Sequence, residues 1–127
     1  MTVTALSDTA AARVHMVEGQ IRPNKVTDER LVEALLEIPR ELFVPKAARG
    51  IAYVDQTLPV GNGRCLLEPM LFGRRLQEVV IEPTDTVLDV GCATGYSTAV
   101  LSRLAATVVG IESDGDLVQH ASQALAA

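Results

Sequence analysis

The pattern of apolar and polar positions divides this chain into a first half of short helices and a second half in which strands and helices alternate. Two short apolar runs at 86–90 and 107–111 are bounded by turn residues, which is typical of buried strands. Apolar positions at helical spacing follow each run and predict helices over 96–105 and 115–127. A strand–helix–strand–helix order favours parallel strands. We therefore predict an α/β fold whose second half is a parallel β-α-β-α unit.

The first half of the chain predicts three helices. The first covers 9–21, the second begins after an N-cap at Thr27, and the third covers 69–80. A proline bounds each of them. Apolar positions recur on one face of each helix. These positions are Val14, Val17, Ile21, Leu31, Leu35, Ile38, Phe72, Leu76 and Val79. Residues 52–64 carry frequent proline and glycine and predict irregular structure or short strands, and residues 1–8 predict a loose tail.

Composition favours one domain with an aliphatic core. The chain has 127 residues, of which 48% are hydrophobic but only 3% aromatic. A net charge of −5 without a basic run argues against nucleic acid as a main partner, and no apolar segment approaches a membrane span. No secretory signal is visible, so we expect a cytoplasmic location. Cys65 and Cys92 are isolated, as are His15 and His120, so we expect free thiols and no metal site.

The sheet predicted for this chain is small. An open α/β sheet needs several strands, whereas only two good parallel candidates occur, and the last helix reaches Ala127 without a glycine cap or a following strand. We therefore expect an N-terminal part of a larger protein. A self-contained small domain is the alternative, and an unfinished sheet could in either case drive self-association.

The segment that joins the first strand to its helix carries the most chemical information. It runs Asp89-Val-Gly-Cys-Ala-Thr-Gly-Tyr96, and Glu112 follows the second strand. Gly91 and Gly95 allow the backbone to approach a ligand, and the start of the helix offers unpaired N–H groups. Glu112 stands where an acidic residue accepts hydrogen bonds from ribose hydroxyls in dinucleotide folds. The segment therefore predicts a site for a nucleoside-containing cofactor.

The spacing of this turn differs from the dinucleotide fingerprint G-x-G-x-x-G, because it runs Gly91-x-Ala93-x-Gly95 with Asp89 ahead of it. A carboxylate would repel a pyrophosphate and suits a cationic or amine-bearing ligand, so a nicotinamide-dependent oxidoreductase is the weaker hypothesis. Asp89 could instead cap the turn, and Tyr96 could begin an exposed helix. The predicted cofactor-binding residues are Asp89, Gly91, Cys92, Ala93, Gly95, Tyr96 and Glu112.

This turn resembles motif I of the class I methyltransferases, which bind S-adenosylmethionine. Further short motifs precede it in order. They are Ile38-Pro-Arg-Glu-Leu-Phe-Val-Pro45, Ala52-Tyr-Val-Asp55, Leu58-Pro-Val-Gly61 with Gly63, and Glu68-Pro69. Together they resemble the protein-L-isoaspartate O-methyltransferase family over about residues 26–112.

The resemblance implies the N-terminal part of a Rossmann-like methyltransferase fold. Residues 1–82 would form a helical and irregular cap, and residues 83–127 would begin the cofactor-binding sheet. It also implies methyl transfer from S-adenosylmethionine to the carboxyl group of isoaspartyl residues in damaged proteins. Asp89 and the two glycines would shape the cofactor pocket, and Glu112 would hold the ribose.

One segment departs from the family pattern. Family members usually read Gly-Gln-Thr-Ile-Ser-Gln-Pro, whereas this chain reads Gly63-Arg-Cys-Leu-Leu-Glu-Pro69, so Leu67 replaces the serine. Leucine forms no hydrogen bond, and the catalytic residue therefore stays open. Arg64 is a candidate anion contact or a solvated arginine, and Asp55 a site residue or a turn acceptor. An S-adenosylmethionine-binding homologue with another acceptor or no activity, and a fragment that binds no small molecule, are the alternatives.

Overall fold

The computed structural model describes residues 8–127. Of the tail predicted for residues 1–8, residues 1–7 lie outside the described part, and Asp8 already belongs to a helix. The helices are α1 (Asp8–Met16), α2 (Glu29–Glu37), α3 (Pro69–Val79), α4 (Tyr96–Ser102) and α5 (Gly115–Ala126). Short helical turns are η1 (Val17–Ile21), η2 (Arg22–Asn24), η3 (Arg40–Phe43) and η4 (Lys46–Ile51). The strands are β1 (Leu58–Gly61), β2 (Arg64–Leu66), β3 (Thr86–Val90) and β4 (Thr107–Ile111).

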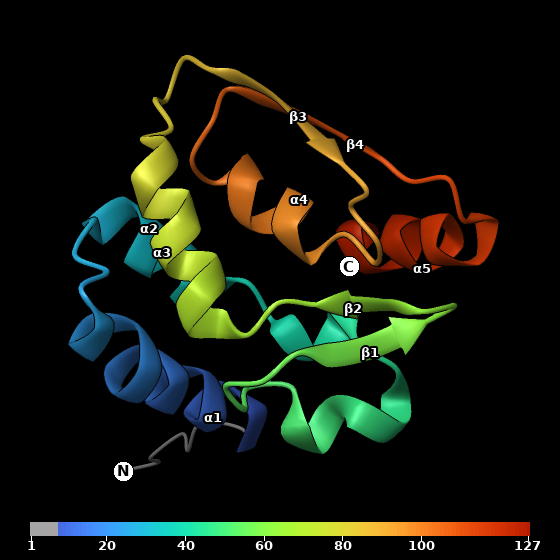
Figure 1. Ribbon diagram of the computed structural model, residues 1–127, viewed down its shortest axis with the longest axis horizontal. Helices are drawn as coiled ribbons and strands as arrows, with labels where there is room; N and C mark the ends of the chain where they lie inside the picture. Colours follow the sequence, from blue (N-terminus) through green and yellow to red (C-terminus); the bar gives the residue numbers. More distant parts are fainter. Residues whose placement is uncertain (1–7) are drawn as a thin grey trace, which may run out of the picture.

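Strands β3 and β4 pair in parallel and are joined through α4, which confirms the predicted β-α-β-α unit (Figure 1). The pairing runs in register from Thr86 opposite Thr107 to Val90 opposite Ile111. Because parallel strands end at the same edge, the turn after β3 and the residues after β4 lie next to each other. This register brings the two predicted parts of the cofactor site together.

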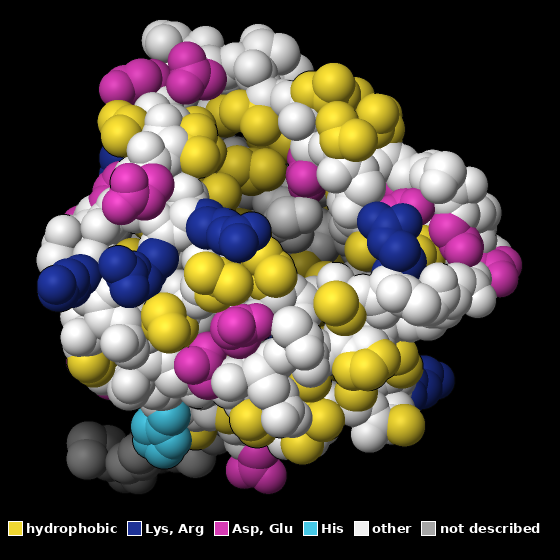
Figure 2. All heavy atoms as spheres, in the orientation of Figure 1, with side chains coloured by type: hydrophobic (Ala, Val, Ile, Leu, Met, Phe, Trp, Pro, Cys, Tyr) yellow, Lys and Arg dark blue, Asp and Glu magenta, His cyan; other side chains and the backbone are white. Residues whose placement is uncertain are grey.

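The β3–β4 pair is covered on one face. Val87 and Val108 are half-buried and pack against the core, whereas alternate side chains point the other way. The exposed fractions on that other face are 61% for Leu88, 70% for Val90, 49% for Val109 and 46% for Ile111. Figure 2 shows apolar side chains gathered over these strands. The pair therefore behaves as a sheet with one packed and one open face.

The first half of the chain packs against α4 and adds an antiparallel hairpin. Residues 52–64 were predicted as irregular or short-stranded, and the structure forms β1 and β2, which pair with a bulge between Pro59 and Gly61. The hydroxyl of Thr94, in the turn before α4, donates to the carbonyl of Phe43 in η3 at 2.6 Å. One buried apolar cluster runs through both halves.

Two helix starts or faces were predicted incorrectly. Helix α2 is capped by Asp28, whose side chain accepts from the backbone N–H of Arg30, and not by Thr27. Thr27 instead donates its N–H to the side chain of Gln77 on α3, which fixes it outside the helix. The helix predicted over 9–21 widens into the π-turn η1, and Val14 is left 38% exposed.

Two helix ends also differ from the prediction. Helix α3 ends at Val79, which is 67% exposed because the helix has left the core there, so the predicted apolar face stops before it. Helix α4 ends at Ser102 and not at residue 105. The cause is tertiary, since the N–H groups of Ala106 and Thr107 both donate to the carbonyl of Asp85 and draw the chain into β4.

Candidate cofactor site

The turn after β3 holds three residues in the left-handed region. Gly91 has φ 72°, Ala93 has φ 50° and Gly95 has φ 94°. A Cβ on Gly95 would lie 3.2 Å from the Cβ of Ala121 on α5, so glycine is needed there for both conformation and space. The N–H of Gly91 donates to the carbonyl of Ile111 at 2.8 Å, which ties the turn to the end of β4.

Asp89 is the second-last residue of β3, and its side chain faces the start of α4. Its Oδ2 accepts from the hydroxyls of Ser97 at 2.6 Å and Thr98 at 2.8 Å. Its Oδ1 has no hydrogen-bond partner among residues 8–127. Oδ2 of Asp89 therefore fixes the helix start, whereas Oδ1 is available in the cavity, and its contact with a ligand stays a prediction.

Glu112 lies directly after β4 with a side chain that is only 1% exposed. Its Oε1 accepts from the N–H of Ala93 at 2.9 Å, and its Oε2 accepts from the N–H of Asp114 at 3.0 Å and from Arg64 at 2.7 Å. These backbone donors and the guanidinium hold the pKa of Glu112 at about 2, below its ordinary value of 4.5. Glu112 is therefore an ionised acceptor that has three donors in this structure, one at Oε1 and two at Oε2.

Two cavities flank Gly91. The first has a volume of about 260 Å³ and is lined by Arg40, Cys65, Leu66, Leu67, Phe72, Asp89, Gly91, Cys92, Ala93, Tyr96 and Ser97. The second has a volume of about 350 Å³ and is lined by Arg64, Val90, Gly91, Ile111, Glu112 and Ser113. One carboxylate of the predicted site therefore lies in each cavity, with the glycine turn between them.

Tyr96 forms part of the floor of the first cavity. It is 2% exposed, so the hypothesis of an exposed helix start is wrong. Its ring centroid lies 5.7 Å from that of Phe43 and 5.5 Å from that of Phe72, and the guanidinium of Arg40 lies 4.8 Å above the ring. Its hydroxyl is buried and has no hydrogen-bond partner in the described part of the chain.

Arg40 lines the same cavity and was missed as a site residue. Its side chain is fully buried, with Nε donating to the carbonyl of Ala52 at 2.6 Å and Nη2 to that of Leu67 at 2.8 Å. No carboxylate pairs with it within residues 8–127. The Pro-Arg-x-x-Phe-Val-Pro motif contained the signal, but these contacts link segments that are distant in sequence.

The remaining predicted residues take different places. Asp55 accepts from the N–H of Met70, 15 residues further along the chain, at 3.1 Å at the start of α3, so the hypothesis of a local turn acceptor is wrong, and Asp55 lines neither cavity. Cys92 is buried, which raises the pKa of its thiol, and both cysteines are free. Gly95 packs against α5 and lines neither cavity. Leu67 lies in the first cavity, together with Asp89.

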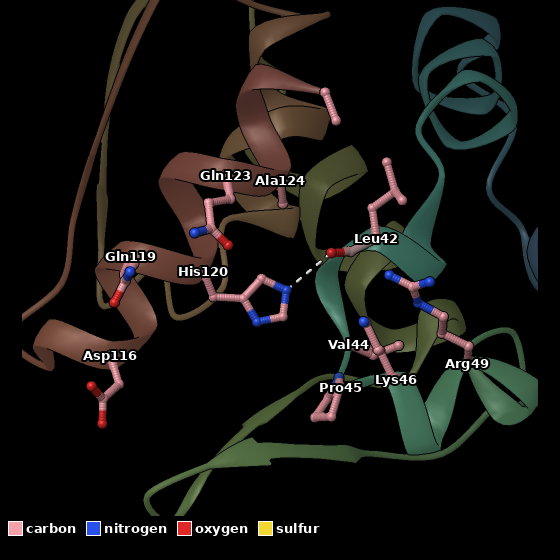
Figure 3. Close-up of a pocket in the computed structure, with 11 residues that line it drawn as sticks. Leu42, Val44, Pro45, Lys46, Arg49, Asp116, Gln119, His120, Gln123 and Ala124 are labelled. Carbon is pink, nitrogen blue, oxygen red and sulfur yellow. Dashed lines mark hydrogen bonds between the residues drawn. The ribbon is translucent and has the colours of Figure 1, made fainter.

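A larger cavity of about 520 Å³ lies between α5 and the turns η3 and η4 (Figure 3). The ring of His120 reaches across it, with Nε2 at 3.0 Å from the carbonyl of Leu42. Lys46 and Arg49 line the opposite wall. This cavity shares no lining residue with the two cavities beside Gly91, so it is separate from the predicted cofactor site.

Among the helices of residues 8–127, none combines the length and the apolar character that a membrane-spanning helix requires.

Comparison with known proteins agrees with this geometry. A family model described as protein-L-isoaspartate(D-aspartate) O-methyltransferase matches residues 11–127. A protein-L-isoaspartate O-methyltransferase of Methanoculleus marisnigri is 40% identical over 114 residues, which cover 90% of this chain and 52% of that protein. One from Aeropyrum pernix is also 40% identical, over 90% of this chain and 45% of that protein. The chain thus spans about half the length of these curated relatives.

Solved structures show the same fold. A protein-L-isoaspartate O-methyltransferase superposes with a TM-score of 0.76 at 26% identity, over 90% of this chain and 38% of that one. A putative enzyme of that name from Plasmodium falciparum, in complex with S-adenosyl-L-homocysteine, superposes with a TM-score of 0.73 at 18% identity, over 94% of this chain and 56% of that one. The predicted Rossmann-like methyltransferase fold is confirmed, and the chain belongs to the protein-L-isoaspartate(D-aspartate) O-methyltransferase family.

Proposed function

We propose that this chain serves S-adenosylmethionine-dependent methylation of the carboxyl group of isoaspartyl residues in damaged proteins. The observation that carries the proposal is the pair of carboxylates placed on either side of Gly91, each in its own cavity. Asp89 and Glu112 stand at the ends of adjacent parallel strands, where open α/β sheets bind their ligands. Membership of the family supplies the reaction class and the protein substrate.

The residues around Gly91 fit S-adenosylmethionine. The cofactor carries an ammonium group and a ribose, and a carboxylate suits each of them. The free Oδ1 of Asp89 can accept from the ammonium group, and Glu112 can accept from the ribose hydroxyls. When bound, the cofactor would supply an electrophilic methyl group that passes from its sulfonium to the acceptor carboxylate, with the neutral thioether S-adenosylhomocysteine as the leaving group.

The protein residues chiefly position the two reactants and keep water away. Methyl transfer to a carboxylate needs no strong acid or base, so alignment of the reacting groups provides most of the rate enhancement. Phe72 and Tyr96 give the first cavity an apolar wall, and the guanidinium of Arg40 packs on the ring of Tyr96. Such a wall limits the access of water to the place where the acceptor carboxylate would meet the methyl group.

A second candidate function is favoured by Leu67. Its side chain lines the first cavity where relatives place a serine hydroxyl, so no hydroxyl from this position can orient an acceptor carboxylate. The chain could then bind the same cofactor and methylate another acceptor, or bind it without turnover. The two candidates share the cofactor and differ in whether the isoaspartyl carboxyl group is methylated.

Calorimetric titration with S-adenosylhomocysteine and a methyl-transfer assay separate these candidates. We expect micromolar binding, together with methyl ester formation on a peptide that contains isoaspartate and none on the matched aspartate peptide. Binding without ester formation favours the second candidate, and Leu67→Ser is then expected to raise turnover on the isoaspartyl peptide. A folded chain that does not bind S-adenosylhomocysteine contradicts both candidates.

A further inference from the structure

Arg64 links the β1–β2 hairpin to the candidate cofactor site. Its Nη1 lies 2.7 Å from Oε2 of Glu112, and its Nη2 donates to the carbonyl of Gly91 at 2.9 Å. The guanidinium therefore fills the space between the glycine turn and the predicted ribose acceptor. Its side chain is 35% exposed, whereas that of Glu112 is 1% exposed, so the arginine covers the carboxylate.

The other partners of Glu112 are fixed by the fold. The N–H of Ala93 belongs to the turn before α4, and the N–H of Asp114 belongs to the start of α5. Neither donor can leave without unfolding the element to which it belongs. Among the partners that the described structure gives Glu112, Arg64 alone sits on a long, partly exposed side chain that can rotate away. A ligand that needs this carboxylate therefore competes with Arg64.

The hairpin is tied down at a second point. Asn62, at the tip between β1 and β2, donates its side-chain amide to Oδ2 of Asp114 at 2.7 Å. Asp114 caps α5 through its other oxygen, which accepts from the N–H of Asp116 at 3.0 Å. Figure 1 shows the hairpin tip lying beside α5. The hairpin is thus held beside the site at two points, and Arg64 is the point that lines the second cavity.

We propose that Arg64 gates the ribose subsite, so that a nucleoside with adjacent ribose hydroxyls must displace its guanidinium from Glu112 in order to bind. The inference rests on the proposed function, because it takes Glu112 as the ribose acceptor. In the free chain Arg64 compensates the buried charge of Glu112 and holds the hairpin closed. On binding, the hydroxyls replace Nη1 at Oε2, and the hairpin then loses one of its two ties and depends on the bond from Asn62 to Asp114.

The substitution Arg64→Gln tests the gate, because it removes the charge and keeps a polar side chain. We expect S-adenosylhomocysteine to bind the variant about two- to fivefold more tightly by calorimetry, the range for loss of one partly exposed ion pair. Arg103→Gln is the matched control, since it breaks an ion pair with Glu37 at 3.1 Å that lies away from both cavities, and affinity is expected to stay unchanged. Arg64→Lys should fall between the wild type and Arg64→Gln.

Hydrogen exchange provides a readout that does not depend on turnover. Adding S-adenosylhomocysteine to the wild-type chain should speed amide exchange in residues 58–66 and slow it in residues 89–96, and free Arg64→Gln should already exchange quickly over 58–66. Equal or weaker binding by Arg64→Gln, or protection of the hairpin by the ligand, overturns the gate alone. Absence of binding by wild type and variant alike, with both folded, overturns the proposed function and the gate with it.

Discussion

Glu112 is the residue in which folding and the proposed cofactor site meet. Its carboxylate joins the glycine turn, the start of α5 and the hairpin through three donors, and it is ionised because each of them favours the charged form. A residue with these contacts cannot be optimised for ligand binding alone. Its replacement therefore changes stability as well as affinity.

We predict that Glu112→Gln destabilises the chain by about 1–3 kcal/mol at pH 7, because the partly exposed guanidinium of Arg64 and two backbone donors lose a charged acceptor. The pKa of Glu112 is lowered from 4.5 to about 2 by folding, so its contribution is complete above pH 4.5 and is lost as the pH falls toward 2. The difference between wild type and variant should shrink over that range.

Urea unfolding at several pH values between 2 and 7 measures this difference. Glu33→Gln, at an exposed position of α2, is the control and should track the wild type throughout. A difference between Glu112→Gln and wild type that stays constant from pH 7 to pH 2 would contradict the assigned ionisation of Glu112.

At the scale of elements, the end of α3 carries local strain. Val80 has φ 57° and ψ 68°, a left-handed conformation that disfavours a β-branched side chain, and 66% of it is exposed. We predict that Val80→Gly stabilises the chain by about 0.5–1 kcal/mol, since relief of the left-handed conformation exceeds the entropy lost by glycine.

Val79→Gly is the matched control for this prediction. Val79 is the neighbouring residue with 67% exposure, but it lies in the helix, so glycine there should destabilise by about 0.5 kcal/mol. Thermal and urea unfolding of the two variants measure both changes. Changes of the same sign in the two variants would refute the assigned end of α3.

Element boundaries show how far the sequence could lead. Strands 86–90 and 107–111 were predicted correctly because each is a short apolar run between turn residues, a signal contained within the run itself. The end of α4 was missed because contacts with Asp85, which are not local, draw residues 106 and 107 into the strand. Likewise, the N–H groups of Thr27 and Asp28 both donate to Gln77 of another helix, a contact that the local cap pattern does not contain.

The candidate site divides in the same way. Glu112 and the glycine turn were found because a known spacing connects them to a ligand. The bond between Arg64 and Glu112 spans 48 residues, and Arg40 reaches a carbonyl 27 residues away. Contacts over such separations leave no periodic signal in a single sequence. The sequence therefore indicated where a ligand is expected to bind, but not which side chains cover or support that place.

At the scale of the whole molecule, the packed face and the open face of the β3–β4 pair contribute differently to the free energy of unfolding. Half-buried Val87 and Val108 contact the core, whereas Leu88 and Val90 on the opposite face are 61% and 70% exposed. Threonine is common in strands, so replacing an apolar strand residue by threonine adds a polar group with little effect on the backbone. The two faces can therefore be compared with one kind of substitution.

We predict that Val87→Thr and Val108→Thr each destabilise the chain by about 1 kcal/mol, because a hydroxyl replaces a methyl group in the packed layer. Leu88→Thr and Val90→Thr should stay within about 0.5 kcal/mol of wild type, since they remove little buried area. Urea unfolding at one protein concentration measures the four values.

Sedimentation over a range of concentrations then tests the predicted self-association. The double variant Leu88→Thr with Val90→Thr should abolish it if the open face joins two copies. Equal destabilisation from both faces would show that the open face is covered in solution, and self-association that persists in the double variant would place the contact elsewhere on the molecule.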